Sequence, residues 1–115
     1  MENLLSLVVN ATDNCIYVKD QDLRFLFVNS AVSRLYEADA ESMIGKSDVD
    51  FIASEQSALF NEADRRVIDS GVNECFRFEI EIKGVMYMAE DHKFLVMIDG
   101  SRCVAGIGIL TPKAG

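Results

Sequence analysis

Residues 75–83 read CFRFEIEIK, and from Phe76 onward apolar and charged side chains alternate without a break. Successive side chains of an extended chain point to opposite faces, so this alternation predicts a strand with one buried and one solvent-exposed face. Two more stretches typical of strands follow at residues 85–97 and 102–110, separated by turn residues. We therefore expect the last third of the chain to form three antiparallel strands.

The segment before these strands has a helical pattern instead. Apolar residues recur at helical spacing between Ser54 and Gly71 and predict a helix over 54–70 that ends at the glycine. Its apolar stripe consists of Leu59, Phe60, Ala63 and Val67. Shorter patterns further upstream predict helices at 30–37 and 40–44, one turn at 48–52, a hairpin of strands 15–19 and 24–29, and an amphipathic helix at 2–11.

These elements predict one α+β domain, which the length of 115 residues also favours. The order of helix, two strands, short helices, one longer helix and three strands suits a five-stranded antiparallel sheet. We expect the helices to pack on one face of that sheet, with the N-terminal amphipathic helix beside it. The sequence contains no internal repeat or low-complexity segment.

The charge balance narrows the classes of partner. Nineteen acidic residues against eleven basic ones give a formal net charge of −8. Such a surface repels phosphate backbones and anionic lipids, so we expect neither nucleic-acid binding nor membrane insertion. The longest apolar run, Cys103 to Leu110, is far shorter than the roughly 20 residues of a membrane span.

The cysteines and the histidine argue against a metal site. Cys15, Cys75 and Cys103 are widely separated, no C-x-x-C motif occurs, and His92 is the only histidine. We expect the cysteines to be small core residues, the alternative being a reactive thiol in an electropositive setting. Their odd number and scatter favour a reducing, cytoplasmic compartment.

Several short sequence motifs occur at defined positions among these elements. They are IYVKD at 16–20, RFLFVN at 24–29, MIGKSD at 43–48, DRRVI at 64–68, Lys93-Phe94, Asp99-Gly100 and VAGIG at 104–108. In this order and spacing they resemble the PAS family of sensory domains over residues 3–111. The sequence departs from the family pattern where Ile52-Ala53-Ser54 and Leu95 replace usual prolines, and where Leu110-Thr111 shortens a closing Asp-x-Thr motif.

The resemblance implies a PAS domain at 13–111, a flanking helix at 1–12, and at 112–115 the start of a linker to an output domain outside this chain. It implies a bacterial sensory module that binds a small molecule or a partner and regulates that output domain, a diguanylate cyclase or a two-component histidine kinase. The alternative is a ligand-free module that serves only dimerisation and protein–protein interaction. We expect no catalysis by this chain itself, because no nucleophile and base motif is present.

Relatives of this type enclose a small cavity between the inner face of the sheet and the longer helix. The candidate lining residues are Phe27, Phe51, Phe60, Phe76, Phe78, Tyr87, Asp91, Lys93 and Ile107. The alternative is that the apolar members of this set only fill the core. In the strand at 85–97, the Lys93-Phe94 motif favours the face of Tyr87, Asp91 and Lys93 as the inward one, whereas a bulge would reverse the assignment.

We expect any ligand to be a small polar or anionic molecule that contacts Tyr87 and Lys93, with Asp91 pairing Lys93 when no ligand is bound. Haem and flavin are disfavoured. Residues 40–70 contain no cysteine for a flavin adduct, the helix at 54–70 offers no histidine to haem iron, and Gly106-x-Gly108 lies in a strand rather than a nucleotide loop.

The N-terminal helix carries the candidate dimer interface. Its apolar stripe consists of Leu4, Leu5, Val8 and Val9. A helix this short is marginal in water and must pack against its own sheet or against a partner. We therefore expect a homodimer.

Overall fold

The computed structural model describes residues 3–113. Its helices are α1 (Leu4–Ala11), α2 (Ser30–Tyr36), α3 (Ala40–Met43), a 3-10 turn η1 (Asp48–Asp50) and α4 (Ser54–Ser70). Its strands are β1 (Cys15–Lys19), β2 (Phe25–Val28), β3 (Glu74–Ile82), β4 (Val85–Ile98) and β5 (Ser101–Pro112). The elements follow the predicted order, and their bounds differ from the predicted ones by a few residues at most.

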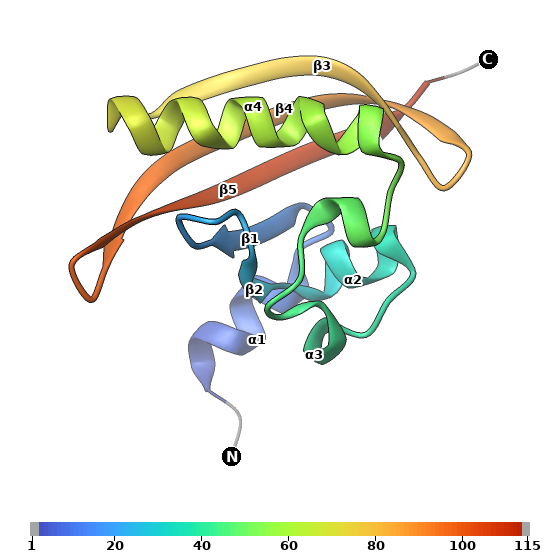
Figure 1. Ribbon diagram of the computed structural model, residues 1–115. Coiled ribbons are helices and arrows are strands. Elements are labelled where there is room, and N and C mark those ends of the chain that lie inside the picture. The colour runs from blue at the N-terminus through green and yellow to red at the C-terminus, as the bar shows by residue number, and fades with distance from the viewer. Residues whose placement is uncertain (1–2, 114–115) are drawn as a thin grey trace.

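All five strands form one sheet in the spatial order β2-β1-β5-β4-β3. Every neighbouring pair is antiparallel, which confirms the predicted sheet. Strand β5 lies at the centre between β1 and β4, so the N-terminal hairpin and the C-terminal strands share one ladder. In Figure 1, α4 runs across β3, β4 and β5, whereas α2 and α3 lie at the β1 and β2 end.

The register of β4 and β5 fixes which side chains face the helices. Ala89, Asp91 and Lys93 are buried, whereas Met86, Met88 and His92 between them are exposed, so the Tyr87 face of β4 is the inward one. On β5 the partners of Asp91 and Lys93 are Gly108 and Gly106. The inner face of the central strand is therefore bare of side chains where β1 and α4 approach it.

Two apolar clusters fill the space between sheet and helices. The larger one joins α2, α3 and the start of α4 to β1, β2, β3 and β4, with Tyr36, Met43 and Phe60 among its buried members. The smaller one packs Val67 and Ile68 of α4 against Val104 of β5. The apolar stripe predicted for residues 54–70 therefore does face the sheet, with Phe60, Ala63 and Val67 buried.

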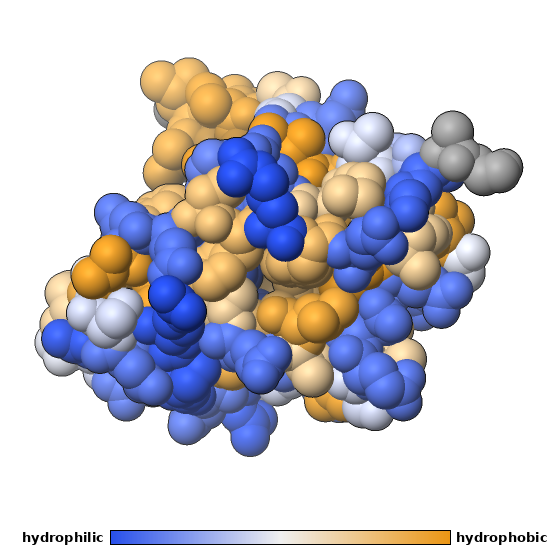
Figure 2. Space-filling model, turned by 90° about the horizontal axis from the view of Figure 1, so that it is seen from above, coloured by the Kyte–Doolittle hydropathy of each residue, from blue (hydrophilic) through white to orange (hydrophobic). Residues whose placement is uncertain are grey.

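Apolar side chains also reach the surface. Figure 2 shows them between hydrophilic side chains on the face seen from above. Leu4, Leu5 and Val8 of α1 are 76, 68 and 60 % exposed, and α1 has no buried residue. Asn29 holds α1 in place by donating from Nδ2 to the Val9 carbonyl over 2.7 Å. The apolar stripe of α1 is thus anchored to the domain but not covered by it.

Within residues 3–113, no helix has both the length and the apolar character to cross a membrane. The expected flanking helix at 1–12 corresponds to α1, and its first two residues lie outside the described part of the chain. The expected linker at 112–115 begins inside β5 at Pro112, and residues 114–115 lie outside the described part.

Candidate functional site

Asp64 of α4 is the centre of a buried charged cluster. Its carboxylate is 0 % exposed and accepts hydrogen bonds from two lysines, from Lys19 Nζ at 2.5 Å and from Lys93 Nζ at 2.6 Å. Lys19 is the last residue of β1, and Lys93 lies in the middle of β4. Lys19 and Lys93 are only 2 and 1 % exposed, so one carboxylate joins the long helix to two strands away from water.

A second carboxylate extends the cluster toward the short helices. Asp48 in η1 is 1 % exposed and accepts from Lys19 Nζ at 2.5 Å. Its other oxygen accepts from the hydroxyl of Tyr36, the last residue of α2, at 2.6 Å. Lys19 therefore lies between Asp48 and Asp64 and connects α2 and η1 to α4.

A third carboxylate, Asp91, closes the cluster on the side of the sheet. The Tyr17 hydroxyl donates to both Asp91 oxygens, at 3.1 and 3.0 Å, and accepts from Lys93 Nζ. Lys93 Nζ is also 3.1 Å from Asp91 Oδ2. The Tyr17 ring lies over Gly106, where a Cβ atom would come within 2.2 Å of the hydroxyl oxygen. Only glycine leaves room for Tyr17 at this position of β5.

Burial and charge act on these groups in opposite directions. Burial alone raises the pKa of the Asp64 carboxyl, but the ammonium groups of Lys19 and Lys93 outweigh it and hold the pKa below its ordinary value. Burial lowers the pKa of Lys19, and the carboxylates of Asp48 and Asp64 raise it further than burial lowers it. Burial and the nearby carboxylates both raise the pKa of Tyr17, so its hydroxyl stays protonated and donates.

A small cavity of about 30 Å³ adjoins the cluster between the sheet and the helices. Its polar lining comes from Tyr17, Lys19, Tyr36, Asp48 and Asp91. Its apolar lining is completed by Cys15, Phe25, Val32, Leu35, Phe60, Gly108 and Leu110. That volume has room for about two water molecules, so a larger guest requires the apolar walls to move apart.

The structure brings some of the residues predicted from the sequence to this region. Phe60 and Asp91 line the cavity, and Lys93 lies in the cluster directly behind it. Phe78 stacks edge-on against Phe60, with ring centroids 5.5 Å apart. Phe51 and Phe76 are half-buried core residues that do not line the cavity, the first beside Tyr36 and the second beside Val67 and Ile68.

Two of the predicted lining residues were assigned to the wrong face. Phe27 pairs with Val18 and lines a groove under α1, on the opposite side of the sheet. Ile107 is 38 % exposed and pairs with Ile16 and His92 on that same outer face. The inward positions of β5 at this point are Gly106 and Gly108, so the apolar side chain between them points outward.

The structure does not bring Tyr87 and Lys93 together, although both were expected to contact one small ligand. Both side chains belong to the inner face of β4, but they are six positions apart, which is about 20 Å along a strand. Tyr87 is half-buried at a surface cleft that it shares with Arg34 and Leu35. The tyrosine that contacts Lys93 is Tyr17 of β1.

Sequence reasoning missed Lys19, Asp48 and Asp64. Asp64 stands four residues after Phe60 and three before Val67, so a helical count places a charge on the buried stripe of α4. Lys19 likewise shares a face of β1 with Cys15 and Tyr17. Charges on faces that are otherwise apolar were the available signal, and they pointed to partners elsewhere in the core.

Comparison with known families gives the classification. A family model described as PAS fold matches residues 9–83, more than half of the chain. The chain belongs to the PAS family. The family predicted from the short sequence motifs is therefore confirmed, and so is the α+β fold.

Two curated relatives of this PAS domain are signalling enzymes. It is 30 % identical over 67 residues to the methanogenesis regulatory histidine kinase FilI of Methanothrix harundinacea. It is 31 % identical over 68 residues to a diguanylate cyclase of Vibrio cholerae. These matches take in 58 and 59 % of this chain but only 8 and 21 % of the two relatives. The chain therefore corresponds to a small part of each of these two proteins.

Solved structures show the same fold. The PAS domain superposes on Vibrio cholerae VqmA, described as a dimer and a LuxR-type receptor, with a TM-score of 0.80 and 20 % identity. That match covers 96 % of this chain and 52 % of VqmA. A second structure, described as VqmA bound to DPO, gives a TM-score of 0.79 at 20 % identity and covers 93 % of this chain and 56 % of that one.

Proposed function

We propose that this PAS domain senses a small polar molecule in the cavity between β1, β5 and the helices, and relays its presence to an output domain. The observation that carries the proposal is the buried cluster at the cavity. Five ionisable side chains, Lys19, Lys93, Asp48, Asp64 and Asp91, are each at most 2 % exposed. Burying ion pairs costs several kcal/mol per ion and is often no better for stability than apolar packing. Their presence is explained by a role in binding.

The cluster also indicates what kind of molecule would bind. Three carboxyl groups face two ammonium groups, and both ammonium groups already contact carboxylates. An anion would therefore meet an excess of negative charge, so of the polar or anionic ligand expected from the sequence we propose the polar one. Within residues 3–113, Asp91 accepts hydrogen bonds from the Tyr17 hydroxyl and forms an ion pair with Lys93, which leaves acceptor capacity at the cavity wall. A neutral or cationic molecule with N–H or O–H donors fits it.

The cluster offers a route from the cavity to the rest of the fold. A molecule larger than about two waters must displace apolar walls such as Leu35, Phe60 or Leu110. Phe60 belongs to α4, which Asp64 joins to β1 and β4. A ligand that favours a widened cavity therefore favours a different placement of α4 on the sheet, which is the population shift that a sensor requires.

Occlusion of the cavity tests this proposal. In Gly108→Ala, the new methyl group would lie 3.3 Å from Leu110 Cδ1 and 3.5 Å from Asp91 Oδ1, at the cavity wall. We expect native mass spectrometry of the wild-type domain with a panel of small neutral and cationic polar molecules, and with DPO in addition, to show a bound species. Gly108→Ala should lose that species.

Ile107→Ala is the matched control, because Ile107 is the next residue of β5 and lies on the outer face. It should bind as the wild type does. Equal binding by wild type and Gly108→Ala would place the ligand elsewhere, and no binding of any compound would favour a ligand-free module.

The type of output domain that receives the signal can be inferred from the curated relatives. We infer that it is a histidine kinase or a diguanylate cyclase domain, because both curated relatives combine a matching region with such an activity.

The three cysteines are free thiols, which supports the reducing, cytoplasmic compartment expected from the sequence.

A second function, homodimerisation, is favoured by the uncovered stripe of α1. Leu4, Leu5 and Val8 are more than half exposed, whereas Val9 is half-buried beside Ile16 and Phe27. An eight-residue helix with no buried residue of its own is marginal in water. We infer that a second copy of this chain covers the stripe, as a dimer built from the predicted residues Leu4, Leu5, Val8 and Val9.

Light scattering on the double variant Leu5→Glu, Val8→Glu tests the dimer. Each glutamate would be buried without a partner, so we expect the dimer dissociation constant to rise about 100-fold or more and the variant to elute as a monomer. The matched control is Met86→Glu, Met88→Glu, which places two charges on the exposed outer face of β4. Dissociation of the control, with the α1 variant still dimeric, would move the interface to the sheet.

A further inference from the structure

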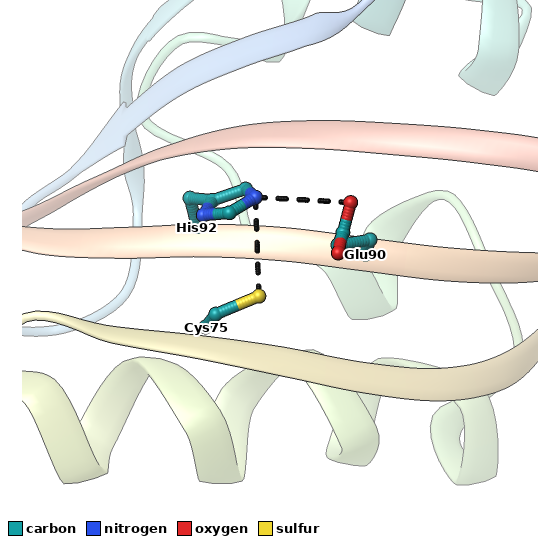
Figure 3. Close-up of side chains that lie close together, drawn as sticks. All are labelled: Cys75, Glu90 and His92. Atoms are coloured by element: carbon teal, nitrogen blue, oxygen red, sulfur yellow. Dashed lines mark hydrogen bonds and ion pairs between the residues drawn. The ribbon is translucent and has the colours of Figure 1, made fainter.

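Three side chains with different metal-binding atoms meet on the outer face of the sheet, opposite the cavity. Cys75 of β3 and His92 of β4 are direct cross-strand partners, and Glu90 lies two residues before His92 on the same face. Figure 3 shows the three side chains turned toward one another from the two strands. The distance from Cys75 Sγ to His92 Nε2 is 3.9 Å, and that from His92 Nε2 to Glu90 Oε2 is 3.8 Å.

These separations are close to those of ligands that share a zinc ion. With bonds of about 2.3 Å to sulfur and about 2.0–2.1 Å to nitrogen or oxygen, a tetrahedral site sets S···N at about 3.6 Å and N···O at about 3.4 Å. All three donor atoms lie within 4.8 Å of one another. Side-chain shifts of a few tenths of an ångström complete the geometry, and Cys75 and Glu90 are only half-buried, so their side chains can make them.

The chemistry of the donors selects the metal. A thiolate with an imidazole and one carboxylate suits Zn²⁺, whereas Mg²⁺ and Ca²⁺ prefer oxygen ligands alone. A thiolate and a carboxylate balance the two charges of the ion. Arg77 donates to Glu90 Oε1 at 3.0 Å from Nε and at 2.6 Å from the terminal nitrogen. That contact orients the carboxylate and leaves Oε2, the oxygen nearest His92, for a metal.

We propose that Cys75, Glu90 and His92 bind one Zn²⁺ ion on the outer face of the sheet. Three protein ligands leave the fourth tetrahedral position to water or to a donor from another molecule. The ion ties β3 to β4 through side chains, in addition to the backbone ladder. The sequence alone argued against a metal because the ligands are scattered along the chain. The antiparallel register of β3 and β4 brings them together.

The test uses untagged protein, freed of metal with a chelator, kept reduced with a phosphine and titrated with Zn²⁺ alone against a zinc-sensitive indicator. We expect one ion per chain. Cys75→Ser and His92→Gln should each weaken binding by at least about 10–100-fold, the loss already seen when only a supporting contact is removed. Co²⁺ in place of Zn²⁺ should give thiolate-to-metal charge-transfer absorption, and Cys75→Ser should abolish it.

Glu90→Gln is compared with Glu81→Gln. Glu81 lies on β3, on the same outer face of the sheet, and its substitution removes the same charge from an exposed position. Only Glu90→Gln should weaken binding. Zinc near 100 times its Kd should raise the wild-type Tm by roughly 10 °C and leave that of His92→Gln unchanged. No uptake by the wild type, equal affinity in all variants, or a cobalt spectrum without the thiolate band would overturn the site.

Discussion

Among single substitutions that preserve the shape of the side chain, Asp64→Asn should lower the free energy of unfolding of this domain the most. The change keeps the volume but removes the charge that Lys19 and Lys93 share in a place without water. Breaking a buried ion pair by removing one partner costs about 3–5 kcal/mol, against a total stability of about 5–15 kcal/mol for a native domain. We expect urea unfolding followed by circular dichroism to show a loss in this range.

Asp69→Asn is the matched control, because Asp69 lies on α4 but is exposed. It should change the free energy of unfolding by less than about 0.5 kcal/mol. If both variants unfold at the same urea concentration, the cluster has no energetic role.

The same residue sets a pH dependence. The folded pKa of Asp64 is lowered, so its contribution is complete above its ordinary value of 3.8 and is lost as the pH falls from there through the folded pKa. Lys19 has a raised folded pKa, so its contribution is complete below its ordinary 10.5 and is lost as the pH rises through the folded value. In Asp64→Asn we therefore expect a shallower loss of stability on acidification than in the wild type.

Gly106→Ala should be the second most damaging change, although it adds only one methyl group. That methyl would come within 2.2 Å of the Tyr17 hydroxyl oxygen and within 2.3 Å of the ring carbon that carries it. Tyr17 would have to move, and with it the hydrogen bonds to Lys93 and Asp91. Overpacking a core usually costs about 1–3 kcal/mol, and we expect the upper end of that range here. The free energy of unfolding in urea measures it.

The comparison with Gly108→Ala isolates the cause. Gly108 is the next inward glycine of β5, and its added methyl would meet nothing closer than 3.3 Å. That variant should stay folded within about 1 kcal/mol of the wild type. Equal losses in the two variants would show that the cost comes from changing a glycine in the central strand and not from Tyr17.

The fold could be predicted from the sequence because local patterns and turns agree. The alternation of Phe76 to Ile82 sets one face of β3, the stripe from Phe60 to Val67 sets one face of α4, and Asp99-Gly100 sets the last hairpin. Each pattern needs only neighbours in the chain. Inward orientation was harder to predict for β5, where glycines occupy the inner positions and Ile107 points to the outer face.

The candidate site could be predicted only in part because its members meet through long-range contacts. Asp91 and Lys93 stood out as charges in the middle of a strand, and both belong to the cluster. Their partners Tyr17 and Asp64 lie 76 and 29 residues from Lys93 along the chain. The same limit applies to Cys75 and His92, which become neighbours only through the register of β3 and β4.

The sharing of Asp64 by two lysines also restricts how the sequence of this domain can drift over generations. Losing the aspartate leaves Lys19 with Asp48 and Lys93 with Asp91 as their remaining acidic partners, and losing either lysine removes one of the two lysine partners of the aspartate. An all-apolar set of similar volume is often as stable as a buried ionic one, but every single substitution on the way to it passes through a weakened protein. The core can therefore exchange Lys19, Asp64 and Lys93 only as a group, which slows the loss of the charged cluster during mutational drift.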